Sequence, residues 1–338
     1  MPRGVANYGH EFYEHIFELL LRLKANYLWP AMWNNAFNED DTLNARLANE
    51  YGIVMGTSHQ EPMLRAQKEW DRRYMRTLGP WNYAKFPDTL NNFWSEGIKR
   101  NKNYESIVTI GLRGENDTPM ASGGLDSNMD LLRNIIVAQR KLLTEEINPD
   151  VTKIPQLWCP YKEVMAYYNA GMRVPNDVTM LWTDDNWGNI RRLPTPEERA
   201  RSGGAGIYYH FDYHGGPRNY QWINTNPISK IWDQMSLAKQ YGADRIWIVN
   251  VGHLKGYELP ISYFMDLAWN TSRWTNGNIN EYTRLWAQQQ FGSQYADQIA
   301  DILEKYTKYN QIRSFIDRGK GLFHKYRITI ERDDIVSL

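Results

Sequence analysis

Side chains that can exchange protons or bind anions follow most of the apolar runs in this chain. The run at residues 178–183, for example, is followed directly by Asp184, Asp185 and Asn186. A neutral carboxylic acid can donate a proton and a carboxylate can accept one, so these carboxyl groups are candidates for acid–base catalysis. The other polar sets that follow apolar runs are His59 with Glu61, Arg113 with Glu115 and Asp117, Lys162 with Glu163, His210 with Tyr213, and Lys255.

Glycoside hydrolysis is the reaction that these residue types favour. It needs one protonated carboxyl group at the leaving oxygen and one carboxylate that activates water or attacks carbon. The acid needs a raised pKa, which apolar neighbours such as Trp158 and Tyr161 could provide. The chain shows no nucleophilic Ser or Cys motif, and its 14 Trp and 22 Tyr residues supply rings that can form a flat platform for sugars.

Simpler structural roles could explain some of the same residues. An acidic residue directly after a strand often caps the next helix, a role that suits one of Asp184 and Asp185. Glu163 would stand at the start of a helix, where a carboxylate interacts favourably with the helix dipole. These roles account for single positions, but they do not explain why seven successive apolar runs end in residues of catalytic type.

The composition argues against several other classes of protein. Lys plus Arg equals Asp plus Glu, at 39 each in 338 residues, so no basic surface for nucleic acid is expected. The single cysteine, Cys159, excludes an internal disulfide and a Cys-rich zinc site. We expect no membrane span and find no signal peptide at the start of the chain. His59, Glu61, His210 and Asp212 could ligate a metal, but no H-E-x-x-H spacing supports it, so we expect neither metal nor cofactor.

The elements that carry these residues alternate between apolar strands and amphipathic helices. Predicted strands start near residues 27, 53, 106, 154, 178, 205 and 244. Continuously apolar strands that alternate with helices indicate a parallel sheet covered on both faces. We therefore predict a (β/α)₈ TIM-type barrel over residues 1–275 that lacks its first strand, followed by the start of a helical domain over residues 276–338. In such a barrel the carboxyl ends of all strands meet at one rim, which would bring the polar sets together.

A doubly wound open sheet is the alternative fold. That fold usually carries a glycine-rich phosphate turn, G-x-G-x-x-G, after an early strand. The early apolar runs here, YLWPAMW and VMGTSHQ, contain no such turn. The barrel is therefore the preferred prediction.

Seven segments resemble glycoside hydrolase family 115, the xylan α-glucuronidases, and together they cover roughly residues 10 to 270. The resemblance implies inverting hydrolysis, without a cofactor, of α-1,2-linked glucuronic acid or its 4-O-methyl ether from xylan and xylo-oligosaccharides. The segments are LLRLKANYLWPAMW, YGIVMGTSHQEPM, TIGLRGENDTPM, LWCPYKEVMAYY, MLWTDDNWGNIRRLP, GIYYHFDYHGGPRNYQWINT and RIWIVNVGHLKGYELP.

The resemblance assigns roles position by position. YKE makes Glu163 the leading candidate for the general acid, and WTDDN makes Asp184 a candidate catalytic carboxylate. RGEND adds Asp117, and the base role stays open between Asp117, Asp184 and a residue outside this chain. The remaining candidates for contacts with the sugar are His59, Glu61, Arg113, Glu115, Asp185, Asn186, His210, Tyr213 and Lys255. The cations that would suit a uronate carboxylate are Arg113, Lys162, Arg218 and Lys255.

The chain also departs from the family pattern. The family barrel begins with a strand that ends in an acidic motif of Asn-Asp-Glu type and follows another α/β domain, and the family continues beyond Leu338. We therefore expect a fragment of a longer enzyme that is inactive when made alone. The alternatives are a non-catalytic carbohydrate-binding fragment and a barrel hydrolase that acts on another uronate-containing glycan.

The resemblance also bears on partners and location. The expected substrates are glucuronoxylan or aldouronic acids, and a homodimer is one option for the full-length enzyme. Nucleic acid and membranes are not expected as partners. The family is typically secreted or periplasmic, although this chain carries no signal peptide.

Overall fold

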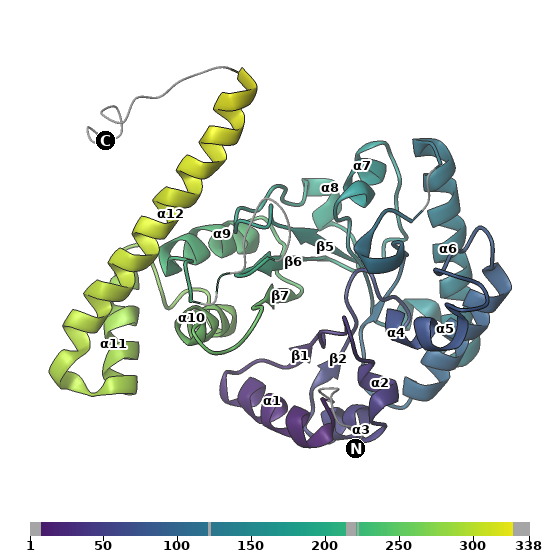
Figure 1. Cartoon of the computed structure of the whole chain (residues 1–338), viewed down its shortest axis with the longest axis horizontal. Coiled ribbons are helices and arrows are strands. Elements are labelled where there is room, and N and C mark those ends of the chain that lie inside the picture. The colour runs from purple at the N-terminus through teal and green to yellow at the C-terminus, as the bar shows by residue number, and fades with distance from the viewer. Residues whose placement is uncertain (1–7, 121–122, 214–220, 222, 327–338) are drawn as a thin grey trace. The chain divides into compact units, whose positions relative to one another are not determined.

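A computed structural model describes residues 8–120, 123–213, 221 and 223–326 of the chain, with side chains up to residue 312 (Figure 1). Short strands alternate with helices, and the strands lie where the apolar runs predict them. They are β1 (Tyr27–Leu28), β2 (Val54–Met55), β3 (Val108–Thr109), β4 (Gln156–Trp158), β5 (Thr179–Thr183), β6 (Ala205–His210) and β7 (Trp247–Asn250).

The described part of the chain also contains twelve helices and three short 3₁₀ turns, and loops join these elements. The helices are α1 (His10–Arg22), α2 (Phe37–Asp40), α3 (Leu43–Glu50), α4 (Gln67–Tyr74), α5 (Pro87–Asn101), α6 (Leu125–Glu146), α7 (Glu163–Asn169), α8 (Pro196–Arg199), α9 (Ile228–Gln240), α10 (Glu258–Trp269), α11 (Ile279–Phe291) and α12 (Ala296–Tyr326). The 3₁₀ turns are η1 (Glu115–Asp117), η2 (Val151–Lys153) and η3 (Ser293–Tyr295). Among these helices none is both long and apolar enough to cross a membrane.

Strand pairing follows the order of the chain. One ladder joins β1 to β2 in parallel, and a second ladder runs β3-β4-β5-β6-β7. A parallel bridge between Met55 and Ser106, with a hydrogen bond of 3.0 Å from the Ile107 N–H to the Met55 carbonyl, links the two ladders. This consecutive order is that of a barrel, whereas a doubly wound sheet reverses its order at a switch point, so the alternative fold is excluded.

The sheet is a parallel half-barrel in the described part of the chain. Its pairing ends at β1 on one side and at β7 on the other, and no described strand pairs with both. The structure therefore confirms an α/β fold with a parallel sheet in barrel order. The complete eight-stranded barrel, the helical extension and the domain boundary near residue 275 stay predictions.

The chain divides into two compact units. The first contains residues up to 185, 190–209 and 237–248, and the second contains residues 186–189, 210–236 and those from 249 onward. Strands β1 to β5 lie in the first unit together with all but the last residue of β6. This first unit contains the carboxyl ends of β2, β3, β4 and β5, where most of the predicted site residues stand.

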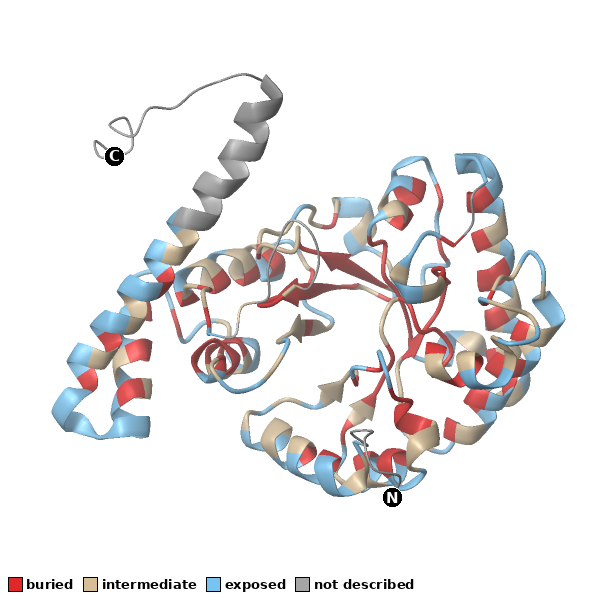
Figure 2. Ribbon diagram, in the orientation of Figure 1, coloured by how far each residue is buried: buried red, intermediate tan, exposed pale blue. Residues whose placement is uncertain are grey.

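Apolar side chains from most strands of the first unit meet in one interior cluster. Figure 2 shows β5 and β6 coloured largely as buried. The ring of Trp29, next to β1, lies 5.2 Å from the ring of Tyr208 on β6. The sheet must therefore curve, because side chains from its first and sixth strands are in contact. The members of the interior cluster are Leu157, Cys159, Tyr161, Leu181, Tyr208 and Ile248, with Tyr27, Trp29, Ile107 and Ile246 packed against them.

Helices shield the outside of the sheet by burying one face each. Helix α1 buries Tyr13 and Phe17 and exposes Glu11 and Glu14, which is the periodicity of an amphipathic helix. The ring of Tyr13 meets the ring of Phe37 from α2 edge to face, with centroids 4.6 Å apart. Full burial of one such aromatic side chain stabilises the fold by about 1.5–3 kcal/mol.

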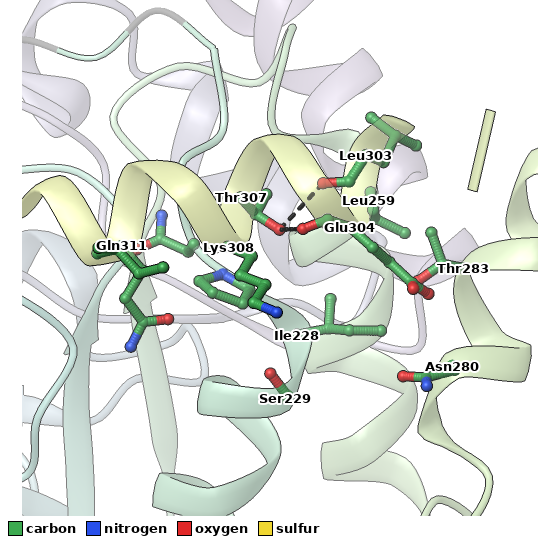
Figure 3. Close-up of a pocket in the computed structure, with 13 residues that line it drawn as sticks. Ile228, Ser229, Leu259, Asn280, Thr283, Leu303, Glu304, Thr307, Lys308 and Gln311 are labelled. Atoms are coloured by element: carbon green, nitrogen blue, oxygen red, sulfur yellow. Dashed lines mark hydrogen bonds between the residues drawn. The ribbon is translucent and has the colours of Figure 1, made fainter. Parts of the chain in front are cut away.

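The second unit is built from helices in its later part. Helices α10 and α11 pack through the rings of Tyr263 and Tyr282, whose centroids are 4.9 Å apart. Figure 3 shows a pocket of about 480 Å³ between the start of α9 and helices α10, α11 and α12, with Thr283 and Glu304 among its lining residues. None of the predicted site residues lines this pocket.

Candidate active site

Asp117 is the centre of a compact ionic cluster in the first unit. Its Oδ1 lies 2.9 Å from His59 Nε2, and its Oδ2 lies 2.5 Å from Lys162 Nζ. Arg113 Nη1 contacts the same carboxylate and also donates a hydrogen bond of 2.6 Å to the Asp117 backbone carbonyl. Residues that follow β2, β3 and β4 therefore converge on one carboxylate, as the barrel prediction requires.

Arg113 joins this carboxylate to a second one. Its Nε and Nη2 donate to the two oxygens of Glu163 at 3.0 and 2.5 Å, which is a bidentate pair. The Arg113 side chain is only 3% exposed, so solvent screens these contacts weakly. We name His59, Arg113, Asp117, Lys162 and Glu163 the Asp117 cluster.

The surroundings of Glu163 differ from those expected for a general acid. We predicted that apolar rings would favour its protonated form, whereas the described contacts give it a cationic partner. A bidentate guanidinium stabilises the ionised carboxylate. The role of Glu163 as the general acid therefore stays a prediction.

Glu61 is a buried carboxyl group in this unit. It is 3% exposed, and its Oε2 accepts a hydrogen bond of 3.0 Å from Ser58 Oγ. Burial raises the pKa of Glu61 from 4.5 to about 8, against the opposing effects of Ser58 and of the Gln67 backbone N–H. Glu61 is therefore mostly a neutral carboxylic acid at pH 7.

The remaining predicted residues of the first unit occupy strand ends. Asp184 follows β5 and is 2% exposed, and its backbone forms an antiparallel bridge with Ile190. Its N–H donates to the Tyr208 carbonyl at 3.3 Å. Asp185 comes next and is half-buried, and Glu115 is half-buried at the start of η1.

Four predicted contact residues belong to the second unit, namely Asn186, His210, Tyr213 and Lys255. His210 is 2% exposed, and its ring lies 6.1 Å from that of Tyr213 at nearly a right angle. Asn186 has a left-handed backbone with φ of 64°, and Lys255 is exposed. Arg218 lies outside the described residues.

The loops that carry the Asp117 cluster contain strained backbone. Asn116, Asp117 and Lys162 have φ of 51°, 61° and 52°, although none of them is glycine. The loop after His59 contains two more such residues, Met63 and Leu64, at φ of 59° and 58°. Left-handed backbone costs an L-residue about 1–2 kcal/mol, and such strain tends to collect at functional sites.

Two neighbours of the cluster were not predicted as site residues. The ring of Tyr161 lies 4.8 Å from that of His59, and the ring of Tyr208 lies 6.0 Å from it. Tyr208 has a sequence signal, since it precedes His210 by two positions on the same strand and so faces the same side of the sheet. Gln67 hydrogen-bonds the loop that carries Asp117, and no local pattern marks it.

The Asp117 cluster can bind an anionic sugar and carry out acid–base chemistry. It contains two carboxylates, two cations and an imidazole, most of them shielded from solvent. Within the described residues, no three His, Cys, Asp or Glu side chains gather in a way that could hold a metal ion. The carboxyl groups and the imidazole of the cluster can transfer protons, and its two cationic side chains can bind negative charge.

Two comparisons with known proteins point to the same family. The family model described as glycosyl hydrolase family 115 matches residues 2–315. A solved structure of a family GH115 4-O-methyl-α-glucuronidase, described as having specificity for decorated arabinogalactans, is similar with a TM-score of 0.85 and 37% identity. The match covers 91% of this chain and 41% of that one, so the chain spans about two-fifths of that protein. No curated protein matches the chain.

Proposed function

The chain belongs to glycosyl hydrolase family 115, and from this membership we propose that it provides the catalytic barrel of an inverting α-glucuronidase. The proposed reaction releases α-1,2-linked glucuronic acid, or its 4-O-methyl ether, from xylan and xylo-oligosaccharides. The observation that carries the proposal is the Asp117 cluster, in which Arg113 bridges Asp117 and Glu163.

Substrate charge connects the cluster to a uronate. The sugar ring of glucuronic acid carries its own carboxylate, and guanidinium groups bind carboxylates in bidentate fashion. Arg113 is engaged in that way by Glu163, so a uronate carboxylate and Glu163 compete for the same guanidinium. In this proposal, substrate displaces Glu163 from Arg113, so that the Glu163 carboxyl group can act on the bound sugar.

The base of the proposed reaction is Asp117, Asp184 or a residue outside this chain. Asp117 contacts the cationic side chains of Arg113 and Lys162. Asp184 follows β5 and is almost fully buried. Inverting enzymes place the two carboxyl groups roughly 6.5–9.5 Å apart, with the water between them.

A second substrate has support from the comparison. The similar structure at 37% identity is described as having specificity for decorated arabinogalactans. Arabinogalactan that carries 4-O-methylglucuronic acid is therefore the second candidate, and it uses the same charge recognition. A non-catalytic fragment that binds such glycans is the remaining alternative.

Product analysis on both glycans tests these proposals. The 338-residue chain, a longer protein that contains it, and the Asp117→Asn variant of each are incubated with aldouronic acids and with glucuronidated arabinogalactan, and released uronic acid is followed by NMR. Release by the parent alone, with the β-anomer formed first, supports the inverting enzyme, whereas the α-anomer formed first contradicts inversion. Binding without release supports the non-catalytic alternative, and the absence of both contradicts a glucuronate site.

A further inference from the structure

The turn at residues 113–118, which we call the Asp117 turn, holds two successive residues in left-handed backbone. Asn116 has φ of 51° and ψ of 40°, and Asp117 has φ of 61°. Two non-glycine residues in this conformation cost on the order of 2–4 kcal/mol together. Contacts from outside the turn must therefore stabilise it, because the unfolded chain avoids this geometry.

Gln67, the first residue of α4, makes such contacts with both atoms of its side-chain amide. Its Nε2 donates to the Gly114 carbonyl at 3.1 Å, and its Oε1 accepts from the Asn116 N–H at 2.8 Å. One amide thus satisfies a backbone acceptor and a backbone donor on either side of Glu115, as a neighbouring strand would. Gln67 is 8% exposed, so water competes little for these bonds.

The contacts of Gln67 place it beside the Asp117 cluster without making it a member. Its side chain bonds only backbone groups of the turn, and its own backbone N–H bonds the Glu61 carboxyl group. The direction of the Asp117 carboxylate follows from the backbone of Asn116 and Asp117. Any loss of the Gln67 bonds therefore reaches Asp117 through the turn.

We propose that Gln67 is a positioning residue for Asp117. Its amide fixes the left-handed Asn116–Asp117 backbone and so aims the Asp117 carboxylate at Arg113, Lys162 and His59. The catalytic consequence rests on the proposed glucuronidase function, whereas the backbone clamp does not. A displacement of about 1 Å in a catalytic group can cost on the order of 100-fold in rate.

The chain offers a closely matched control for this proposal. Gln139 on α6 makes the same two-point clamp on Gly111, donating to its carbonyl at 2.8 Å and accepting its N–H at 2.7 Å. Gln139 is fully buried, and both of these hydrogen bonds go to Gly111, which lies outside the Asp117 turn. Gln67→Met and Gln139→Met therefore each remove one buried amide clamp of similar geometry.

The experiment combines hydrogen exchange with kinetics on the whole chain. In Gln67→Met we expect exchange of the Asn116 amide to accelerate at least about tenfold, and kcat on aldouronic acid to fall about 10- to 100-fold with little change in KM. Gln67→Glu keeps the acceptor for the Asn116 N–H and should retain most of that protection. Gln139→Met should expose the Gly111 amide instead, with Asn116 protected and kcat within a few-fold of the parent.

Each outcome decides the proposal. Unchanged exchange at Asn116 in Gln67→Met overturns the clamp, and faster exchange with unchanged kcat overturns the positioning role. An equal loss of kcat in Gln139→Met also overturns it, because the effect is then general destabilisation.

If the parent releases no glucuronic acid, the proposed activity fails separately from the positioning role. Calorimetric binding of 4-O-methylglucuronic acid then replaces kcat, and we expect binding to be at least tenfold weaker in Gln67→Met. If Gln67→Met does not fold, Gln67→Ala replaces it: faster exchange of the Asn116 amide supports the clamp, and unchanged exchange contradicts it.

Discussion

At the scale of single residues, the guanidinium of Arg113 supplies the positive charge that two neighbouring carboxylates share. It contacts the carboxylates of Asp117 and Glu163 and is itself almost fully buried. Breaking a buried ion pair by removing one partner is strongly destabilising, because the other charge stays buried and unpaired. Variants of these residues therefore need a measurement of folding beside any measurement of activity.

In any active longer protein that contains this chain, Glu163→Gln is expected to abolish turnover while the fold is kept. An amide cannot deliver a proton, and the loss of a general acid typically costs about 10²–10⁴-fold in rate. Glu163 is 19% exposed, so the neutral amide can be accommodated at the edge of the cluster. Uronic acid release and circular dichroism measure the two effects. Activity within a few-fold of the parent would remove Glu163 from the mechanism.

Glu61 should make the stability of the chain depend on pH. Burial raises its folded pKa to about 8 from an ordinary 4.5, so between these values the folded chain holds a proton that the unfolded chain has released. The stability contributed by this group is complete below about pH 4.5 and is lost as the pH rises to about 8, by up to about 1.4 kcal/mol per pH unit. Urea unfolding of the parent and of Glu61→Gln from pH 5 to 9 tests this. Parallel curves for the two proteins would contradict the assignment.

At the scale of elements, the start of α7 combines strain with function. Lys162 precedes the helix with φ of 52° and ψ of −123°, and it brings its own amine to Asp117 while Glu163 opens the helix toward Arg113. Both contacts depend on this one backbone conformation. The two ion pairs that this conformation permits offset its cost in backbone strain.

Comparing the Lys162→Gly and Lys162→Ala variants measures how much this backbone strain costs in stability. Both variants lose the amine that contacts Asp117, but only alanine keeps a Cβ in the unfavourable conformation. We expect Lys162→Gly to be more stable than Lys162→Ala by about 1–2 kcal/mol in free energy of unfolding. Urea unfolding of the two variants gives the difference directly. Equal stability would indicate that the backbone relaxes once the ion pair is gone.

The element pattern could be predicted from the sequence, but the contacts between elements could not. Strands buried on both faces leave continuous apolar runs, so their positions and the polar residues that follow them were predicted correctly. The pair between Arg113 and Glu163 joins residues 50 positions apart, and nothing near either one indicates its partner. The left-handed backbone at Asn116 and the clamp by Gln67 likewise depend on tertiary contacts.

At the scale of the whole molecule, the ends of the sheet matter most. Strands β1 and β7 each have one paired neighbour among the described strands, and both are short and carry few charges. Unpaired edges of apolar strands can pair with other chains. We expect the 338-residue chain to self-associate as its concentration rises, which sedimentation velocity over a concentration series would detect. A single species at all concentrations would show that these edges are protected.

The one thiol of the chain belongs to the interior cluster. The rate at which it is labelled therefore reports how often the sheet opens. Cys159 is 6% exposed, and burial raises the pKa of its thiol, so the reactive thiolate is scarce while the cluster is closed. An alkylating reagent can therefore label the chain only during excursions that open the cluster. If labelling accelerates with urea in step with global unfolding, the curved sheet opens only when the whole chain does. If the rate does not depend on urea, β4 opens locally, and the interior cluster near the Asp117 cluster opens without global unfolding.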